Sequence, residues 1–149
     1  MSASDAFESD ILKLIFNNTT IGNIGDVTGV VGSTGVGSVF VALHTADPLD
    51  AGNQSTNEAT YTGYARVAVA RTSGAFTVTG TTPTQVANVA VVLFGLCTAG
   101  SNTLTHFSIG YQTSGATKII VSGALTASLS VSAGITPSFA ASALVATCD

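Results

Sequence analysis

The chain has 149 residues, of which 46% are hydrophobic and 8% are charged, and its formal net charge at pH 7 is -4. Its cationic side chains are Lys13, Arg66, Arg71 and Lys118, which form no cluster able to displace the counterions of DNA or RNA. The longest apolar stretch, residues 89–97, is far shorter than the ~20 residues that span a bilayer. Nucleic acid is therefore excluded as a main partner, and no membrane segment is expected.

The low charge also indicates how the protein behaves toward other protein. Globular proteins usually contain about 25% charged residues, and interspersed charge protects a surface from association. A surface with so few charges must consist largely of Ser, Thr, Ala and Gly, so we expect assembly. The acidic N-terminus MSASDAFESDILK lacks the positive region of a secretory signal, and export by that route is not expected.

The first predicted element is an amphipathic helix in the stretch SDAFESDILKLIFNN. Its Ser and Asp residues favour an N-cap, and Asp5 and Glu8 lie near the positive end of the helix dipole. The spacing of the apolar side chains predicts one helical face, made by Phe7, Ile11, Leu14 and Ile15. This face packs either on its own domain or on a neighbouring subunit, and we favour the neighbour.

Residues 18–37 hold six of the sixteen glycines and show no regular period. Such a segment is costly to order and predicts an extended arm or irregular loop. We therefore expect an N-terminal helix and glycine-rich arm at residues 1–37, followed by a β-domain at residues 38–149.

Short strands are predicted from residue 38 onward. VFVALH and YARVAVAR alternate with period 2, and GAFTVTG, QVANVAVVLF and HFSIGYQ follow between turn-rich connections. In KIIVSGALTASLSV the odd-numbered positions are apolar, which is typical of a sheet with one buried side. Pro137 separates this ribbon from the closing stretch SFAASALVATC.

Seven or eight such strands without intervening helices predict an all-β fold. We expect an antiparallel β-sandwich of jelly-roll type with a short N-terminal helix or arm.

His44 and Asp47, in the string HTADP, are the first candidates for chemistry, as a general base with its orienting carboxylate. The chain has one other histidine, His106, and Asp47 before Pro48 is typical of the start of a turn. We interpret HTADP as a structural transition from a strand to a surface loop.

The second candidate is a metal site. Zinc would require His44, His106, Cys97 and Cys148 to converge, and no pair of them has the spacing of a ligand motif. We expect two partly or wholly buried free thiols instead, with a single disulfide as the alternative.

Calcium in the acidic loop would use Asp47, Asp50 and Glu58, but these acids lack the alternation of an EF-hand. The glycines of GVVGSTGVGS lack the Lys-Ser/Thr pair of a phosphate loop, and no G-x-S-x-G elbow occurs. We predict no catalytic, cofactor-binding or metal-binding residues.

Tyr61 and Tyr64, in YTGYAR, permit two interpretations. A tyrosine ring can close the edge of a core while its hydroxyl bonds to the backbone. Tyrosine together with Arg66 can instead form an exposed interface anchor. We favour the structural role.

The same residues carry a resemblance. VALHTADP, YTGYARVAVAR, THFSIG and SGALTASLSVSAGITPSFAASAL resemble a family of small structural proteins encoded in the virion gene clusters of tailed bacteriophages, most strongly across residues 38–71 and 104–145. Members are variously described as head cement or decoration proteins and as tail-fibre-like proteins. The resemblance implies a jelly-roll-like domain on the capsid exterior, assembled in the bacterial cytoplasm, without catalytic residues.

The leading hypothesis is a non-enzymatic protein that cements or decorates the capsid. It would bind neighbouring major capsid subunits and associate with itself as a homo-dimer or homo-trimer. The alternative is a tail-associated adsorption module that binds a host surface glycan through the loop of residues 47–60, although the chain has no Trp and three Tyr to form an aromatic platform. A cell-wall hydrolase would need two carboxylates about 5 to 9.5 Å apart, whereas the acids concentrate in the helix and one loop.

Overall fold

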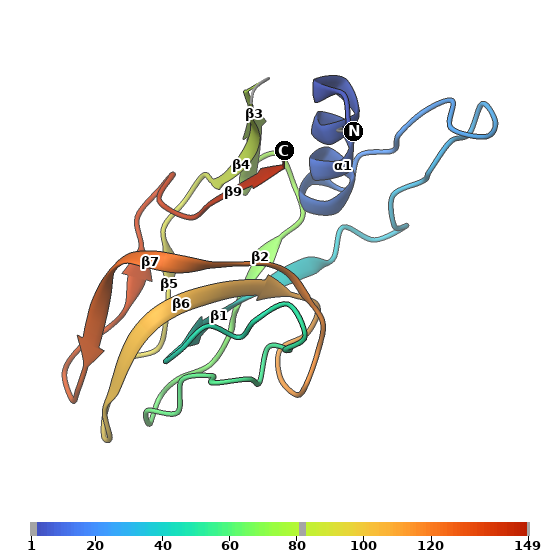
Figure 1. The fold of residues 1–149 in the computed structure, drawn as a ribbon. Coiled ribbons are helices and arrows are strands. Elements are labelled where there is room, and N and C mark those ends of the chain that lie inside the picture. Colours follow the sequence, from blue (N-terminus) through green and yellow to red (C-terminus); the bar gives the residue numbers. More distant parts are fainter. Residues whose placement is uncertain (1–2, 81–82, 149) are drawn as a thin grey trace. The chain divides into compact units, whose positions relative to one another are not determined.

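The computed structural model describes residues 3–80 and 83–148, which belong to two compact units (Figure 1). The first unit comprises Met1–Ser38, Ala70–Val91 and Phe139–Asp149, and the second comprises Val39–Val69 and Val92–Ser138. The first unit thus combines the N-terminal helix with strands from the middle and the end of the chain. The predicted domains, residues 1–37 and 38–149, stay a prediction.

The predicted helix is confirmed as α1 (Asp5–Asn17). Ser4 is its N-cap and accepts a hydrogen bond from the Phe7 backbone N–H at 3.4 Å. At the other end Asn18 adopts the left-handed conformation, with φ of 54°, and its N–H bonds to the carbonyl of Lys13. Both ends therefore satisfy backbone groups that a helix leaves open.

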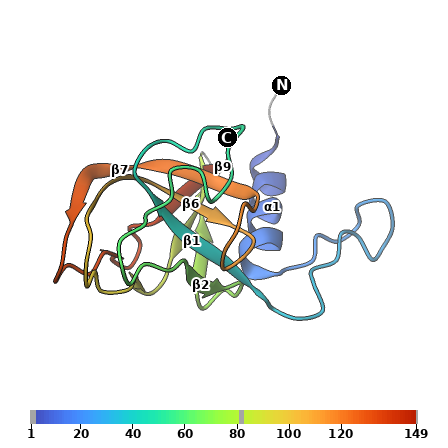
Figure 2. The same cartoon turned by 90° about the horizontal axis from the view of Figure 1, so that it is seen from below.

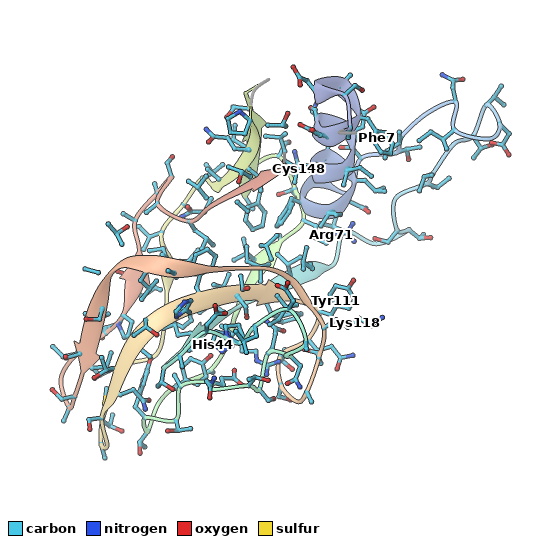
Figure 3. The ribbon with its side chains drawn as sticks, in the orientation of Figure 1. Phe7, His44, Arg71, Tyr111, Lys118 and Cys148 are labelled. Atoms are coloured by element: carbon cyan, nitrogen blue, oxygen red, sulfur yellow. The ribbon has the colours of Figure 1, made fainter. Side chains whose placement is uncertain are left out.

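The buried face of α1 differs from the predicted one. Glu8, Leu12 and Phe16 are buried, while Phe7 is 43% exposed (Figure 3). The Phe16 ring meets the Phe76 ring edge-on, with centroids 5.1 Å apart, and α1 contacts two strands of its own unit. Residues 11–16 are apolar around most of the helix, so their periodicity fixed no single face. Docking of the Phe7 side on a neighbouring subunit stays a prediction.

The C-terminal end of α1 is held by a cation from elsewhere in the chain. Its last turn contains no basic residue, but Arg71 donates to the carbonyls of Ile15 at 2.5 Å and Leu14 at 2.7 Å (Figure 3). A guanidinium here complements the negative end of the helix dipole. A third bond, to Ser33 Oγ at 3.1 Å, ties the helix end to the glycine-rich segment.

The predicted arm, residues 18–37, is a long irregular loop in light blue (Figure 1). Asn18, at the start of the loop, is bonded to Ser33 near its other end. The Oδ1 of Asn18 accepts from the Ser33 N–H at 2.7 Å, and the Nδ2 of Asn18 donates to the Ser33 carbonyl at 2.8 Å. An isolated bridge joins Ile21 and Val30. The prediction of an irregular loop is confirmed.

The strands among the described residues form three sheets. The three-stranded sheet has the order β3-β4-β9 and consists of β3 (Phe76–Thr79), β4 (Thr84–Asn88) and β9 (Val145–Cys148). The four-stranded sheet has the order β2-β1-β6-β7 and consists of β2 (Val67–Ala70), β1 (Ser38–His44), β6 (Asn102–Gly110) and β7 (Ile119–Val131) (Figure 2). The smallest sheet pairs β5 (Val92–Leu93) with β8 (Ser138–Phe139).

Two stretches that were predicted as single runs are each split into two strands, and Asn88 bonds to backbone groups near both breaks. Its side chain is buried, donates to the carbonyls of Ala90 and Ala140 at 2.8 Å, and accepts from the Leu144 N–H at 2.8 Å. These backbone groups belong to the breaks after β4 and before β9. One buried amide thus satisfies polar groups that would otherwise be left unpaired.

In the four-stranded sheet, β1 is buried on both faces near its end. Val41 and Leu43 pair across strands with Ile109 and Phe107, and His44 on the opposite face is fully buried as well. The chain after His44 folds back over this face, so the polar loop is part of the packing of the second unit.

The fold is mostly β with one N-terminal helix. The pairs β1–β6, β6–β7, β3–β4 and β4–β9 are all antiparallel, as predicted, and the described residues form no closed barrel. The strand order does not show a jelly roll, which stays a prediction together with the two-sheet sandwich. In the parts of the chain that the structure describes, no helix is long and apolar enough to cross a membrane.

Candidate functional site

The polar loop after β1 is held from inside by a buried arginine. The Arg66 side chain is 1% exposed. Its Nε and Nη2 donate to the two carboxylate oxygens of Glu58 at 2.6 and 2.8 Å. Paired charge-assisted bonds of this kind are short and directional, so Glu58 is fixed inside the loop.

The remaining donors of Arg66 reach the connection between β6 and β7. Nη1 donates to the Gln112 carbonyl at 3.1 Å, and Nη2 donates to the Gly115 carbonyl at 2.8 Å. Buried Gln54 crosses the same space, since its Nε2 donates to the Phe40 carbonyl at 2.9 Å and its Oε1 accepts from Thr117 Oγ1 at 2.9 Å. One guanidinium therefore couples two loops that lie far apart in the sequence.

The hydroxyls of both tyrosines are engaged inside the protein, and Tyr64 bonds to the polar loop. The Tyr64 hydroxyl donates to Glu58 Oε1 at 3.0 Å and accepts from the Leu43 N–H at 3.1 Å. The Tyr61 hydroxyl donates to the Gly95 carbonyl at 3.1 Å. Burial raises the pKa of both phenols, so they stay protonated at neutral pH. The favoured structural interpretation is confirmed.

His44 lies inside the second unit (Figure 3). Its Nδ1 is 2.8 Å from the Thr56 carbonyl, and its Nε2 is 2.8 Å from Ser108 Oγ. A carbonyl can only accept, so Nδ1 carries the proton and Nε2 accepts from the serine hydroxyl. Burial lowers the pKa of His44, which keeps this imidazole neutral.

On the outer side of the loop, Asp47 lies near His106. Asp47 Oδ2 is 3.9 Å from His106 Nε2, while His106 Nδ1 bonds to Thr105 Oγ1 at 2.9 Å. The two side chains line an open depression of about 700 Å³, with further walls from Leu49, Asp50, Ala51 and residues 122–124 of β7. Carboxylates and an imidazole at the surface can exchange hydrogen bonds with a polar ligand.

Residues 2–147 match the family of the podophage GP4 fiber I protein gp80. The chain belongs to this family. The gp80 family consists of non-enzymatic structural proteins of phage fibres, so the resemblance to tailed-phage virion proteins is confirmed at this level. The fibre description fits the alternative, tail-associated hypothesis better than capsid cement. No curated protein matches the chain.

In this gp80-family chain His44 and Asp47, which were considered above as a general base with its carboxylate, bond to other groups. Asp47 Oδ1 instead accepts from the Leu49 N–H at 2.9 Å, which is the predicted turn start. The pair that does form, His44 with Ser108, has the distance of a nucleophile and its base. Both residues are fully buried, and a backbone carbonyl occupies the position where a triad places a carboxylate. A substrate cannot reach this serine.

Glu58, one of the acids considered above for a calcium site, is held by another contact. Glu58 bonds to Arg66 and so does not join Asp47 and Asp50. Among the described residues, no group of three or more His, Cys, Asp or Glu side chains could hold a metal ion. Cys97 is free and buried, and Cys148 is free and half-buried, as predicted for the thiols.

Proposed function

We propose that this gp80-family chain is a structural subunit of a tail-associated fibre that presents residues 45–60 to a neutral glycan on the host surface. The observation that carries the proposal is the open depression lined by Asp47, Asp50 and His106. It lies on the outer side of a loop whose inner side is fixed by Arg66.

The fixed loop supports binding because little further ordering is required. Gln54 and Glu58 are tied to the protein interior by hydrogen bonds, whereas Asp47 and Asp50 are exposed. Preorganised groups lose less conformational freedom when a ligand binds. The loop thus combines a rigid base with exposed acceptor oxygens.

The charges of the depression select the class of glycan. Its lining includes two carboxylates and one histidine, with neither lysine nor arginine among the residues that form it. Carboxylates accept hydrogen bonds from sugar hydroxyls and repel phosphate or uronate groups. The absence of an aromatic platform in this lining implies weak single contacts, which many copies along a fibre strengthen by avidity.

The adsorption of phage particles tests the site. Asp47→Asn with Asp50→Asn removes two charges, while the new amide at position 47 keeps an oxygen for the Leu49 N–H. Asp10→Asn with Asp26→Asn is the matched control, with the same charge change outside the depression.

We expect the first pair to slow adsorption roughly ten-fold, a difference of about 1.4 kcal/mol in binding, and the control to adsorb normally. A neutral polysaccharide fraction from host cells should compete, and an acidic fraction should not. Equal adsorption of the two double variants would refute the site.

The position of the protein on the virion is tested separately. Antibody labelling of intact particles should mark fibres and leave the capsid lattice unlabelled. Label spread evenly over the capsid would favour the cement hypothesis. A contact with the major capsid protein, the partner implied by the resemblance, stays a prediction.

A further inference from the structure

The second unit carries an exposed aromatic side chain outside the depression. Of the three tyrosines of the chain, Tyr61 is buried and Tyr64 is half-buried, whereas Tyr111 is 55% exposed. Tyr111 directly follows β6, at the start of the connection to β7 (Figure 3). In the parts of the chain that the structure describes, no protein group bonds to its hydroxyl. Both the ring and the hydroxyl are therefore open to a ligand.

Lys118 lies across the connection from Tyr111. Gly110 pairs with Ile119 in the register of β6 and β7, so Tyr111 and Lys118 are the next residues on the two sides. A Cβ on Gly110 would lie 2.6 Å from the Lys118 carbonyl oxygen, which shows how closely the two sides approach. Lys118 is exposed and forms no ion pair with any described residue. Its ammonium can therefore donate hydrogen bonds to a ligand beside the Tyr111 ring.

The connection that carries both residues is held in place by the interior. Arg66 donates to the carbonyls of Gln112 and Gly115, and the Gln54 N–H donates to the Thr117 carbonyl at 2.9 Å. The same two side chains hold the polar loop that lines the depression, so both surfaces rest on one set of internal bonds. Preorganised groups lose less freedom on binding, and a tyrosine has only two side-chain torsions to order.

The spacing along β6 relates Tyr111 to the depression. His106 lines the depression and lies five residues before Tyr111. At ~3.4 Å per residue of an antiparallel strand, the two positions are roughly 17 Å apart. A chain of several sugar units covers such a distance, and a single unit does not.

We propose that Tyr111 and Lys118 form a second subsite for the neutral glycan, a proposal that rests on the proposed function. The Tyr111 ring stacks on the apolar C–H face of one sugar unit, and Lys118 donates to hydroxyl oxygens of that unit. Asp47 and Asp50 accept hydrogen bonds from a unit farther along the same chain. The ligand is thus an extended neutral glycan that contacts an aromatic ring at one end and carboxylates at the other.

Glycan fragments of graded length test the subsite on the purified chain. They are prepared from the neutral polysaccharide of host cells, and calorimetry measures their dissociation constants. Tyr111→Ala should weaken long fragments about three- to ten-fold, the range of one aromatic contact, and leave the shortest binding fragments unchanged. Tyr111→Phe keeps the ring and should bind long fragments nearly as tightly as the unchanged chain.

Two further variants make the comparison specific. Phe7→Ala removes an exposed ring from the first unit and should bind fragments of every length normally. Asp47→Asn with Asp50→Asn should weaken short and long fragments alike, because both kinds contact the depression. Loss of affinity for long fragments alone is therefore the expected signature of Tyr111.

Chemical modification gives a measurement that a merely structural role of Tyr111 would not change. Tetranitromethane nitrates exposed tyrosines, so it should modify Tyr111 before Tyr61 and Tyr64, and long fragments should protect Tyr111 while the shortest do not. Equal affinity of Tyr111→Ala and the unchanged chain for long fragments, or nitration that these fragments do not slow, would overturn the subsite and leave the depression standing. If the unchanged chain bound no neutral fragment of any length, the subsite and the proposed function would fail together.

Discussion

Replacing Arg66 with alanine should strongly destabilise the second unit. The change leaves Glu58 with the Tyr64 hydroxyl as its remaining described donor, and it removes donors from the carbonyls of Gln112 and Gly115. Breaking a buried ion pair by removing one partner costs about 3–5 kcal/mol. We expect Arg66→Ala to lower the free energy of unfolding by about that amount.

Arg66→Lys separates charge from geometry. Lysine keeps the positive charge but cannot reproduce the planar fork that bonds both carboxylate oxygens of Glu58 and the Gly115 carbonyl. Each lost bond to a charged group contributes about 1.5–3 kcal/mol. Arg66→Lys should therefore also be destabilising, though less than Arg66→Ala.

Urea unfolding followed by circular dichroism measures these changes, with Lys118→Ala as the control. Lys118 is exposed and lies beside the same β6–β7 connection (Figure 3). Its loss removes the same charge and should change stability by no more than about 0.5 kcal/mol. Hydrogen exchange should accelerate at residues 53–58 and 112–117 in Arg66→Ala alone. A cost for Arg66→Ala no larger than that of Lys118→Ala would falsify the bracing role.

Two further predictions concern His44 and Gly63. Burial lowers the pKa of His44, so the unfolded chain binds more protons than the folded chain. The contribution of neutral His44 to the free energy of unfolding is therefore complete above about pH 6.5 and is lost as the pH falls, by at most about 1.4 kcal/mol per pH unit. His44→Gln should reduce this pH dependence in urea titrations, and an unchanged slope would contradict the assignment. Gly63 has φ of 102°, and a Cβ there would lie 2.1 Å from the Leu96 carbonyl oxygen. Gly63→Ala should therefore lower the melting temperature and reduce the free energy of unfolding by at least about 1–3 kcal/mol. Gly35→Ala, where a Cβ meets nothing within 4 Å, is its control, and equal melting temperatures would contradict the strain argument.

Local signals in the sequence predicted the elements that depend on neighbouring residues. Ser4 caps α1 through a bond to the third residue after it, and β1 is nearly the predicted run. The turn at Asp47 likewise follows from a bond to Leu49. In each case the deciding contact lies within a few residues, so the pattern carries it.

Contacts between distant residues were not predictable in the same way. Ser108 bonds to a histidine 64 residues away, and Arg66 selects backbone carbonyls at Gln112 and Gly115. A carbonyl acceptor is present at every residue and leaves no sequence signature. Arg66 becomes a buried cation only in the folded loop, so its role could not be predicted from the sequence.

The depression brings together residues that the sequence did not pair. Asp47, His44 and His106 were all considered, but only His44 and Asp47 are close in the sequence, and that pair was set aside in favour of a turn. The register places His44 directly opposite His106 on β6, and the chain reverses after β1, so the exposed Asp47 meets the second histidine instead. The pairing of Asp47 with His106 thus depends on the sheet register, which could not be predicted from the sequence.

The positions of the four cations determine how much positive charge is left on the surface. Arg66 is buried among loop acceptors, and Arg71 is bonded to the end of α1, so two of the four positive side chains are engaged by internal carbonyls and carboxylates. The solvent-facing surface is left with still less charge than the composition suggests. Because few charges protect a surface poorly against association with other protein, the association of copies stays a prediction that this distribution of cations supports.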